Sequence, residues 1–313
     1  MKARGLLLAF TLLTVMSAVA EKQTGNGVIV TKEVEVTPFE SIQIDLKEQK
    51  SKKKGQGAAE ARFLYSQTPG NAALSVTIDE NLFPFLEIAS SGGVLTVKAK
   101  KGVDLFPTVL EFAASSSGLK ALQMSGSSDF EAVTPLTGDK FTVKVSGSGD
   151  VKMPQPIRMS AFTAAVSGSG SVAVGGLFCT KVSATTSGSG NLTLAFGTNR
   201  VSSFTAAISG SGSMVVNNLL CDKMSGKVSG SGSLALTGEA KAADLSVAGS
   251  GQVHSFDFKV SKAKVSTSGS GNANVQAVES LAAKQSGSGS IKYRGNPGSV
   301  KMNISGSGLI KAE

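Results

Sequence analysis

The feature that most constrains this chain is a tetrapeptide, Ser-Gly-Ser-Gly, that returns about every 20 residues. It begins at eight places, and two variants begin at Ser125 and Ala248; the eight are Ser146, Ser167, Ser187, Ser209, Ser229, Ser268, Ser286 and Ser305. A short fixed period is typical of a solenoid, in which each repeat is one coil that buries its apolar side chains against neighbouring coils. Leucine-rich repeats share this period but need a leucine and asparagine signature that is absent here. The motif therefore predicts an all-β fold, a parallel β-helix.

Apolar residues keep fixed places relative to the motif. The fifth residue before each motif from Ser146 onward is apolar, and so is the fifth residue after it; these are Phe141, Phe162, Val182, Phe204, Met224, Ala243, Ala263, Leu281 and Val300 before, and Val151, Val172, Leu192, Met214, Leu234, Val253, Ala273, Ile291 and Ile310 after. Polar residues such as Lys144, Lys264 and Lys301 fill the offsets between them. This alternation predicts strands with one buried face.

The motif itself allows two interpretations. If the extended path continues through it, both glycines face inward and both serines face solvent, which would form two ladders of hydroxyl groups. Alternatively the motif is a turn that needs glycine for its backbone angles. In either case backbone geometry explains why the motif recurs, so the repetition is no evidence of catalysis.

The two cysteines occupy the same position of the repeat. Cys179 and Cys221 each lie twelve residues after a motif start, two coils apart, with Asn199 at the intervening place. Two coils are separated by about 9.6 Å, because stacked strands lie about 4.8 Å apart. That distance exceeds the Cα separation that a disulfide tolerates. We expect two free thiols.

The first 20 residues have the features of a secretory signal peptide. Lys2 and Arg4 precede an apolar run, and small residues up to Ala20 precede the charged Glu21. The apolar run is shorter than the about 20 residues that span a bilayer. We expect cleavage after Ala20, export to the periplasm, the outer-membrane surface or the medium, and no transmembrane segment in the mature chain.

The remaining chain divides at the first motif. Residues 21–124 lack the motif but show β patterns, for example at 28–36, 39–46, 73–78 and 94–99, and predict an N-terminal β-region that caps or begins the stack. Residues 125–313 form the predicted solenoid. Only five residues follow the last motif, so the last coil has an exposed edge at which we expect self-association or docking of a partner.

Charge is unevenly distributed. Residues 21–124 hold 12 basic and 12 acidic side chains, whereas residues 125–313 hold 17 basic and 10 acidic ones, a net charge of +7. Five lysines gather near the start, at Lys47, Lys50, Lys52, Lys53 and Lys54. They form either a solvated loop or a contact for an anionic polymer of the envelope. Nucleic acid is a poor partner for an exported chain with few aromatic residues.

Catalytic candidates are few. Asp129 and Asp150 share one motif place in adjacent coils, but the next coils have Ser171 and Asn191 there, which is typical of turn chemistry. The single histidine, His254, lies at an outward offset. The calcium-binding nonapeptide of some β-helices is absent. We predict no catalytic residue, no metal and no cofactor. An ice-binding surface made by the serine ladders is a minor alternative, because ice-binding helices favour regular threonine.

Several segments together resemble a known family. Gly25-Asn26-Gly27, the pattern Val36-x-x-Phe39-x-x-Ile42-x-Ile44, Asn81-Leu82 and the serial motif are similar to the bacterial family called putative auto-transporter adhesin, head GIN domain, a domain of unknown function. The resemblance implies a right-handed, single-stranded β-helix at the envelope of a Gram-negative bacterium, commonly one of the Bacteroidetes. It brings no catalytic residues.

The sequence thus predicts an exported, non-enzymatic envelope protein that acts as an adhesin or scaffold. Its expected partner is an envelope polysaccharide or another surface ligand. The alternative is a carbohydrate-active β-helix that cleaves envelope or extracellular polysaccharide. An adhesin would bind glycans without turnover, whereas an enzyme would release reducing ends.

Overall fold

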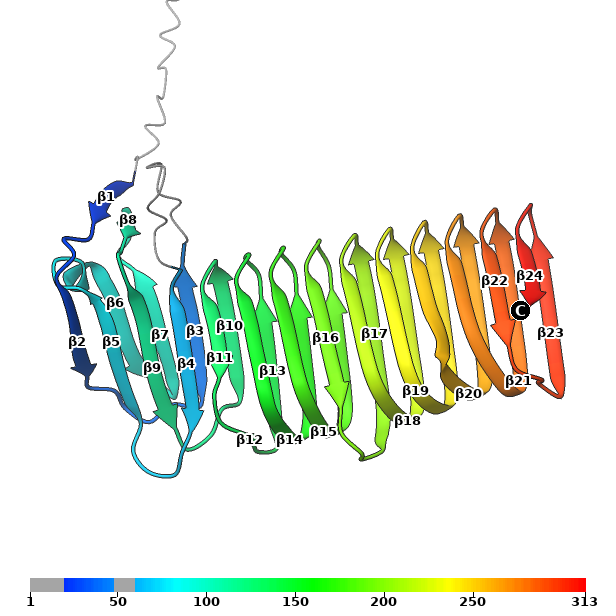
Figure 1. Cartoon of the computed structure of the whole chain (residues 1–313), viewed down its shortest axis with the longest axis horizontal. Coiled ribbons are helices and arrows are strands. Elements are labelled where there is room, and N and C mark those ends of the chain that lie inside the picture. Colours follow the sequence, from blue (N-terminus) through cyan, green and yellow to red (C-terminus); the bar gives the residue numbers. More distant parts are fainter. Residues whose placement is uncertain (1–19, 48–59) are drawn as a thin grey trace, which may run out of the picture.

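The computed structural model describes residues 20–47 and 60–313, and these form one elongated stack of β-strands (Figure 1). From β10 onward each coil stacks on the preceding one through parallel strands whose registers follow the motif; Phe141 pairs with Phe162, and Val151 pairs with Val172. The predicted β-solenoid is confirmed. The predicted signal peptide, except for Ala20, and most of the lysine cluster lie outside the described residues.

Each coil is flattened and has two faces. Face 1 consists of the strands and strand halves that follow each motif, and face 2 consists of those that precede the next motif. Long strands bend near their middle, for example between Met153 and Pro156, and so contribute to both faces. The strands are β14 (Asp150–Val166), β15 (Ser171–Thr186), β16 (Asn191–Phe196), β17 (Val201–Gly210), β18 (Ser213–Gly230), β19 (Ser233–Gly249), β20 (Gln252–Gly269), β21 (Asn272–Gly287), β22 (Ser290–Arg294), β23 (Ser299–Ser305) and β24 (Leu309–Ala312).

The N-terminal strands extend the same two faces. Face 1 continues through β11 (Asp129–Ala132), β4 (Arg62–Gln67), β9 (Leu110–Ser116), β5 (Ala73–Asp79) and β2 (Ile29–Val34), and the last two steps are antiparallel. Face 2 continues through β13 (Lys140–Val145), β10 (Ala121–Gly126), β3 (Ser41–Leu46), β7 (Val94–Ala99) and the antiparallel β6 (Leu86–Ser91). The predicted boundary between residues 124 and 125 falls inside β10, so the sheet is continuous across it.

Four short elements complete the described chain. β1 (Glu21–Thr24) pairs with β8 (Val103–Phe106), β12 (Leu136–Thr137) pairs with β14, and η1 (Phe83–Phe85) is one turn of 3-10 helix. A buried aspartate holds this end together. The Asp79 carboxylate accepts hydrogen bonds from the Gly27 N–H (2.8 Å), the Thr108 N–H (2.7 Å) and the Thr108 hydroxyl (2.9 Å). It thereby ties the start of β2 to the segment before β9.

The core lies between the two faces and follows the predicted columns. Apart from Val300 in the last coil, the residues of the two predicted columns are buried, among them Phe162, Phe204 and Leu234. Where the N-terminal strands join the solenoid, the rings of Phe112, Phe63 and Phe130 stack at centroid distances of 5.6 and 5.8 Å. Because adjacent coils repeat the same spacing, these columns are continuous along the stack.

Candidate binding surfaces

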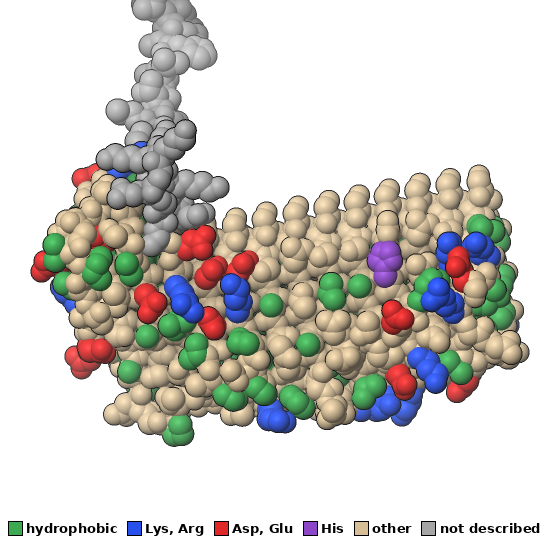
Figure 2. All heavy atoms as spheres, in the orientation of Figure 1, with side chains coloured by type: hydrophobic (Ala, Val, Ile, Leu, Met, Phe, Trp, Pro, Cys, Tyr) green, Lys and Arg blue, Asp and Glu red, His purple; other side chains and the backbone are tan. Residues whose placement is uncertain are grey.

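The motif forms the narrow edge where face 2 turns into face 1. In the eight Ser-Gly-Ser-Gly motifs the second serine is exposed, whereas the second glycine is buried in all but the last, Gly308. The first glycine accepts a backbone hydrogen bond from the next coil; Ser231 N–H donates to the Gly210 carbonyl at 3.0 Å, and Ser270 N–H to the Gly249 carbonyl at 2.9 Å. We name this uncharged row the serine edge, and it runs along the top of the solenoid in Figure 2.

Both interpretations of the motif, the inward glycines and the glycine turn, are partly correct. The second glycine faces inward, and the position requires glycine because no side chain fits there. A Cβ on Gly232 would lie 2.6 Å from the Gly212 carbonyl oxygen and 2.6 Å from Ile208 Cγ2. The first glycine is only partly covered. In several coils it has a positive φ, as in Gly230 (114°) and Gly269 (90°), which is a turn conformation that favours glycine.

The predicted carboxylate pair lies beside the serine edge, one coil apart. Asp129 Oδ1 accepts a hydrogen bond from the Asp150 N–H at 3.0 Å, and Asp150 Oδ1 accepts from the Ser171 N–H (3.2 Å) and hydroxyl (2.7 Å). The same contact recurs further along, where Asn272 Oδ1 accepts from the Ser290 N–H and hydroxyl. Each side chain therefore links its coil to the next, as the turn interpretation expects.

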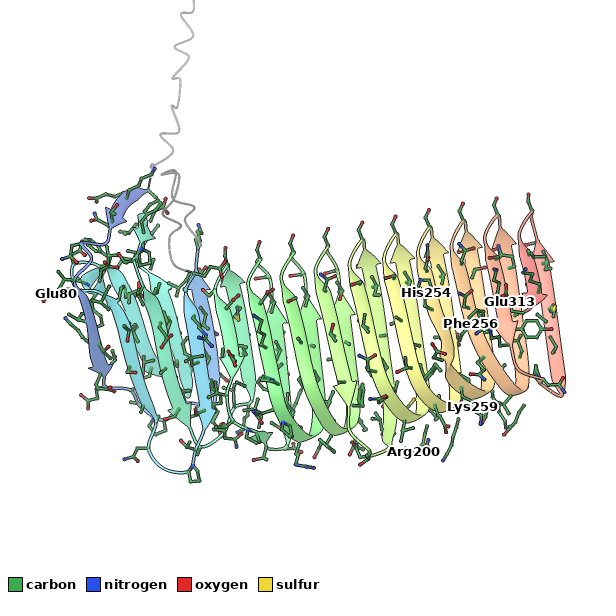
Figure 3. All side chains as sticks on the ribbon, in the orientation of Figure 1. Glu80, Arg200, His254, Phe256, Lys259 and Glu313 are labelled. Carbon is green, nitrogen blue, oxygen red and sulfur yellow. The ribbon has the colours of Figure 1, made fainter. Side chains whose placement is uncertain are left out.

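The other predicted residues lie apart from one another. Lys47 is exposed after the end of β3, while Lys50, Lys52, Lys53 and Lys54 lie outside the described residues. His254 is exposed on face 1, as its outward offset predicted (Figure 3). Across residues 20–47 and 60–313, no three His, Cys, Asp or Glu side chains gather into a group that could hold a metal ion.

The two cysteines are free, as predicted, and both are buried. Burial raises the pKa of Cys179 to about 11 and that of Cys221 to about 12. The residue paired with Cys221 in the preceding coil is Val201, so the expectation that Asn199 lies between the cysteines is wrong. Residues 197–200 bulge out of the coil, and Asn199 instead donates its side-chain N–H to the Cys179 carbonyl at 2.8 Å. The bulge adds two residues to this coil, so the offset from the motif start no longer identifies the residue that pairs with the cysteines.

Face 2 carries most of the positive charge of the solenoid. From β13 to β23, its three outward columns two, four and six residues before the motif hold nine exposed lysines and one carboxylate, Asp244; the lysines are Lys140, Lys144, Lys181, Lys223, Lys227, Lys262, Lys264, Lys284 and Lys301. Lys264 Nζ lies 2.9 Å from Asp244 Oδ2. We name this surface the lysine face. Such an array attracts polyanions in a way that salt weakens.

The lysines are spaced along the coils. Lys181, Lys223 and Lys262 share one column, in which Ser203 and Ala242 occupy the coils between them. Alternate coils are about 10 Å apart, close to the Debye length at 0.1 M salt, so these lysines repel each other only weakly. This spacing therefore allows a positive face with little loss of folding stability.

Face 1 differs sharply from the lysine face. At its two outward positions closest to the serine edge, no Lys, Arg, Asp or Glu side chain occurs in the coils from Ser171 to Asn274. Lys152 precedes this stretch, and Lys292 and Lys311 follow it. The charge of the solenoid is thus concentrated on one of its two broad surfaces.

Sequence reasoning missed the lysine face because it used the outward columns only to recognise alternation. Lys144, Lys264, Lys284 and Lys301 were visible at outward offsets, and all of these precede the motif. Sorting the lysines by whether they precede or follow the motif would have separated the two faces. The Asp79 cluster carried no comparable signal, because its partners are 29 and 52 residues away in the sequence.

Comparisons with known proteins support one family. The family model described as putative auto-transporter adhesin, head GIN domain, matches residues 58–198 and 194–297. A putative adhesin from Parabacteroides merdae is similar in structure, with 25% identity and a TM-score of 0.54. So are a putative lipid binding protein and a putative adhesin from Parabacteroides distasonis, with 28% and 26% identity and TM-scores of 0.50 and 0.51. Each alignment covers 94% of this chain and 100% of the other chain.

The search of curated proteins found no match. In the described part of the chain, no helix has the length and apolar character needed to cross a membrane.

Proposed function

Because the chain belongs to the family described as putative auto-transporter adhesin, head GIN domain, we propose that it is an exported, non-catalytic attachment protein whose lysine face contacts an anionic polymer of a cell surface. The observation that carries this proposal is the asymmetry of the solenoid. Nine lysines and one aspartate occupy the three outward columns of face 2 nearest the following motif, whereas the central coils of face 1 are uncharged beside the serine edge. A broad, flat, positive surface suits an extended polyanion better than a small ligand.

The polymer class follows from the geometry of the charges. Lysine is a flexible point charge that does not demand a planar partner, so carboxylate, sulfate and phosphate groups all suit it. The columns run along the solenoid axis, and a linear polymer lying along the column of Lys181, Lys223 and Lys262 meets one lysine for every two coils. An acidic polysaccharide has this form, and an envelope polysaccharide is one of the partners expected from the sequence.

Binding to polygalacturonate, an acidic polysaccharide, tests the proposal, with uncharged dextran as the comparison. We expect binding to polygalacturonate that weakens as salt rises, and none to dextran. Replacing Lys181, Lys223, Lys262 and Lys284 with Gln should weaken binding about tenfold or more, because each exposed charge contact contributes up to about 1 kcal/mol.

A matched control removes the same charge elsewhere. In the control variant Lys100, Lys101, Lys152 and Lys259 are replaced with Gln, which lowers the net charge by the same four units but leaves the lysine face intact. Equal weakening in both variants would show that net charge alone governs binding and would overturn the proposal.

Two further results separate the alternatives. Loss of binding only when Lys47, Lys50, Lys52, Lys53 and Lys54 are replaced would assign the contact to that segment instead. Release of reducing ends during the incubation would support the carbohydrate-active alternative. Its weak carboxylate pair, Asp129 and Asp150, would then be the first to replace with Asn.

A further inference from the structure

The last coil of the solenoid exposes residues that belong to the core. Val300, Met302 and Ile304 of β23 are 38%, 45% and 47% exposed, whereas their counterparts in the preceding coil, Leu281, Ala283 and Gln285, are almost fully buried. Their positions face inward in every coil, and no residue of the described chain stacks on β23. The exposed surface is thus an open cross-section of the core.

The opposite end of the stack is more closed, although Val28 and Ile29 at the start of its outermost strand on face 1 are 52% and 40% exposed. Its outermost strand on face 2, β6, is covered by the segment that leads into β3, where the Thr37 N–H donates to the Ser90 hydroxyl at 2.7 Å. Leu86 of β6 is already buried, and Lys32 and Glu33 occupy the outermost strand of face 1, β2. Charged and covered edges resist strand addition. The closed end is therefore a poor partner for the open one.

The free backbone groups of β23 follow from the hydrogen bonds of the earlier coils. There, the N–H groups of Thr142, Ala161 and Ser167, at even offsets from the motif, donate to the preceding coil. The N–H and C=O groups at odd offsets therefore point to the next coil. In β23 these belong to Val300, Met302 and Ile304, the residues whose side chains are exposed.

The free backbone groups of β23 are complementary to the same groups in a second copy of the chain. If two β23 strands pair antiparallel about a two-fold axis at Met302, each Met302 exchanges both backbone hydrogen bonds with its copy, and Val300 faces the copy's Ile304. All three inward positions then meet apolar partners. On the outer surface, Lys301 faces the copy's Asn303, so no like charges oppose each other.

The last strand of face 1, β24, is compatible with the same two-fold axis. In an earlier coil Gly226, at the place of Met302, lies against Leu234, at the place of Ile310. An axis through Met302 therefore also passes Ile310 in β24. About it, Ile310 faces its own copy and Lys311 faces the copy's Leu309, which again avoids opposed charges.

We propose that the open end formed by β23 and β24 docks on the same end of a second copy of this chain, giving a two-fold dimer with a continuous core. Both sheets continue across the axis, with antiparallel pairing replacing the parallel pairing of the coils. The contact is apolar and uses backbone hydrogen bonds. It is therefore insensitive to salt, unlike the polyanion binding proposed for the lysine face.

Sedimentation of the purified protein, without polymer and at low and high salt, tests the proposal. We expect a dimer that dissociates on dilution to the same extent at both salt concentrations. Met302→Lys places two ammonium groups face to face at the axis and should abolish the dimer. Because Met302 is 45% exposed in the monomer, folding should tolerate the change. Val278→Lys, at a residue 38% exposed but outside β23 and β24, is the matched control and should remain dimeric.

A cysteine cross-link tests the register. Met302→Cys brings two Cα atoms to about 5.5 Å at the axis, which a disulfide accepts, and mild oxidation should yield a covalent dimer. Lys301→Cys faces the copy's Asn303 and should remain a monomer on a denaturing gel. The native cysteines are buried and do not compete. A monomer at every concentration, open-ended oligomers, or equal cross-linking of both variants would each overturn the proposal.

Discussion

Replacing Gly232 with Ala tests whether the serine edge is set by contact between coils. Gly232 is the buried second glycine of its motif, and its φ lies outside the left-handed region, so alanine costs nothing in backbone angle. The new Cβ would lie 2.6 Å from the Gly212 carbonyl oxygen and from Ile208 Cγ2. Any destabilisation therefore measures the close approach of the coils.

The magnitude can be estimated from these distances. Carbon and carbonyl oxygen normally approach to about 3.3 Å, so the coils must separate locally by about 0.7 Å. Overpacking of this kind costs about 2 kcal/mol, and the Ser233 N–H to Gly212 carbonyl hydrogen bond that it disturbs contributes about 1 kcal/mol. Alanine offsets about 0.7 kcal/mol of this loss, because it lowers the conformational entropy of the unfolded chain. We expect a net loss of about 2 kcal/mol in the free energy of unfolding.

Urea denaturation followed by circular dichroism measures the loss. With a slope of about 3 kcal/mol per molar, the midpoint should fall by about 0.7 M. Gly176→Ala is the matched control, because its Cβ would meet Pro156 Cα at 3.7 Å and Phe178 at 3.8 Å, which are ordinary contacts. Its midpoint should stay or rise slightly. If both variants unfold at the midpoint of the native protein, close contact between coils does not explain the glycine column.

Two further predictions concern buried titratable groups. Burial alone would raise the pKa of Asp79, but hydrogen bonds from Thr108 and Gly27 lower it below the usual value. The charged form therefore stabilises the fold above about pH 5, and this contribution is lost as pH falls through the lowered pKa. Asp79→Asn should cost about 2 kcal/mol in urea unfolding at pH 7, and a difference that persists at acid pH would contradict this. For Cys179 and Cys221, we expect no reaction with a thiol reagent at pH 8 in the folded protein and two thiols per chain in unreduced denaturant; fewer than two would contradict the free cysteines.

The sequence was sufficient for the fold because each coil repeats one local rule. Phe162, Leu234 and the second glycine of each motif fall at fixed offsets, so their burial could be read from spacing alone. The rule failed at Asn199, where four residues leave the coil and shift the register to Val201. An irregular bulge has no counterpart in neighbouring coils, and a periodic argument cannot locate it.

The candidate surfaces were harder to predict, because they depend on residues that do not repeat. The buried bonds of Asp79 join segments that no period relates, and the open end becomes visible only when Met302 is compared with Ala283 one coil earlier. The lysine face could have been found from offsets. Its members belong to three different columns, however, and each column taken alone contains mostly small residues.

Fold and binding occupy separate positions in this solenoid, and this separation explains why the lysine face can exist. Inward residues and glycines contact the adjacent coils, so a change such as Gly232→Ala acts on stability. Outward residues such as Lys223 contact solvent, and most exposed substitutions alter stability by no more than about 0.5 kcal/mol. Lysines in adjacent coils would lie about 4.8 Å apart and oppose stacking, whereas the serine and alanine residues between Lys181, Lys223 and Lys262 double that spacing. Within this column the lysines are therefore as close as they can be without occupying adjacent coils, which favours a ligand that supplies many negative charges at once.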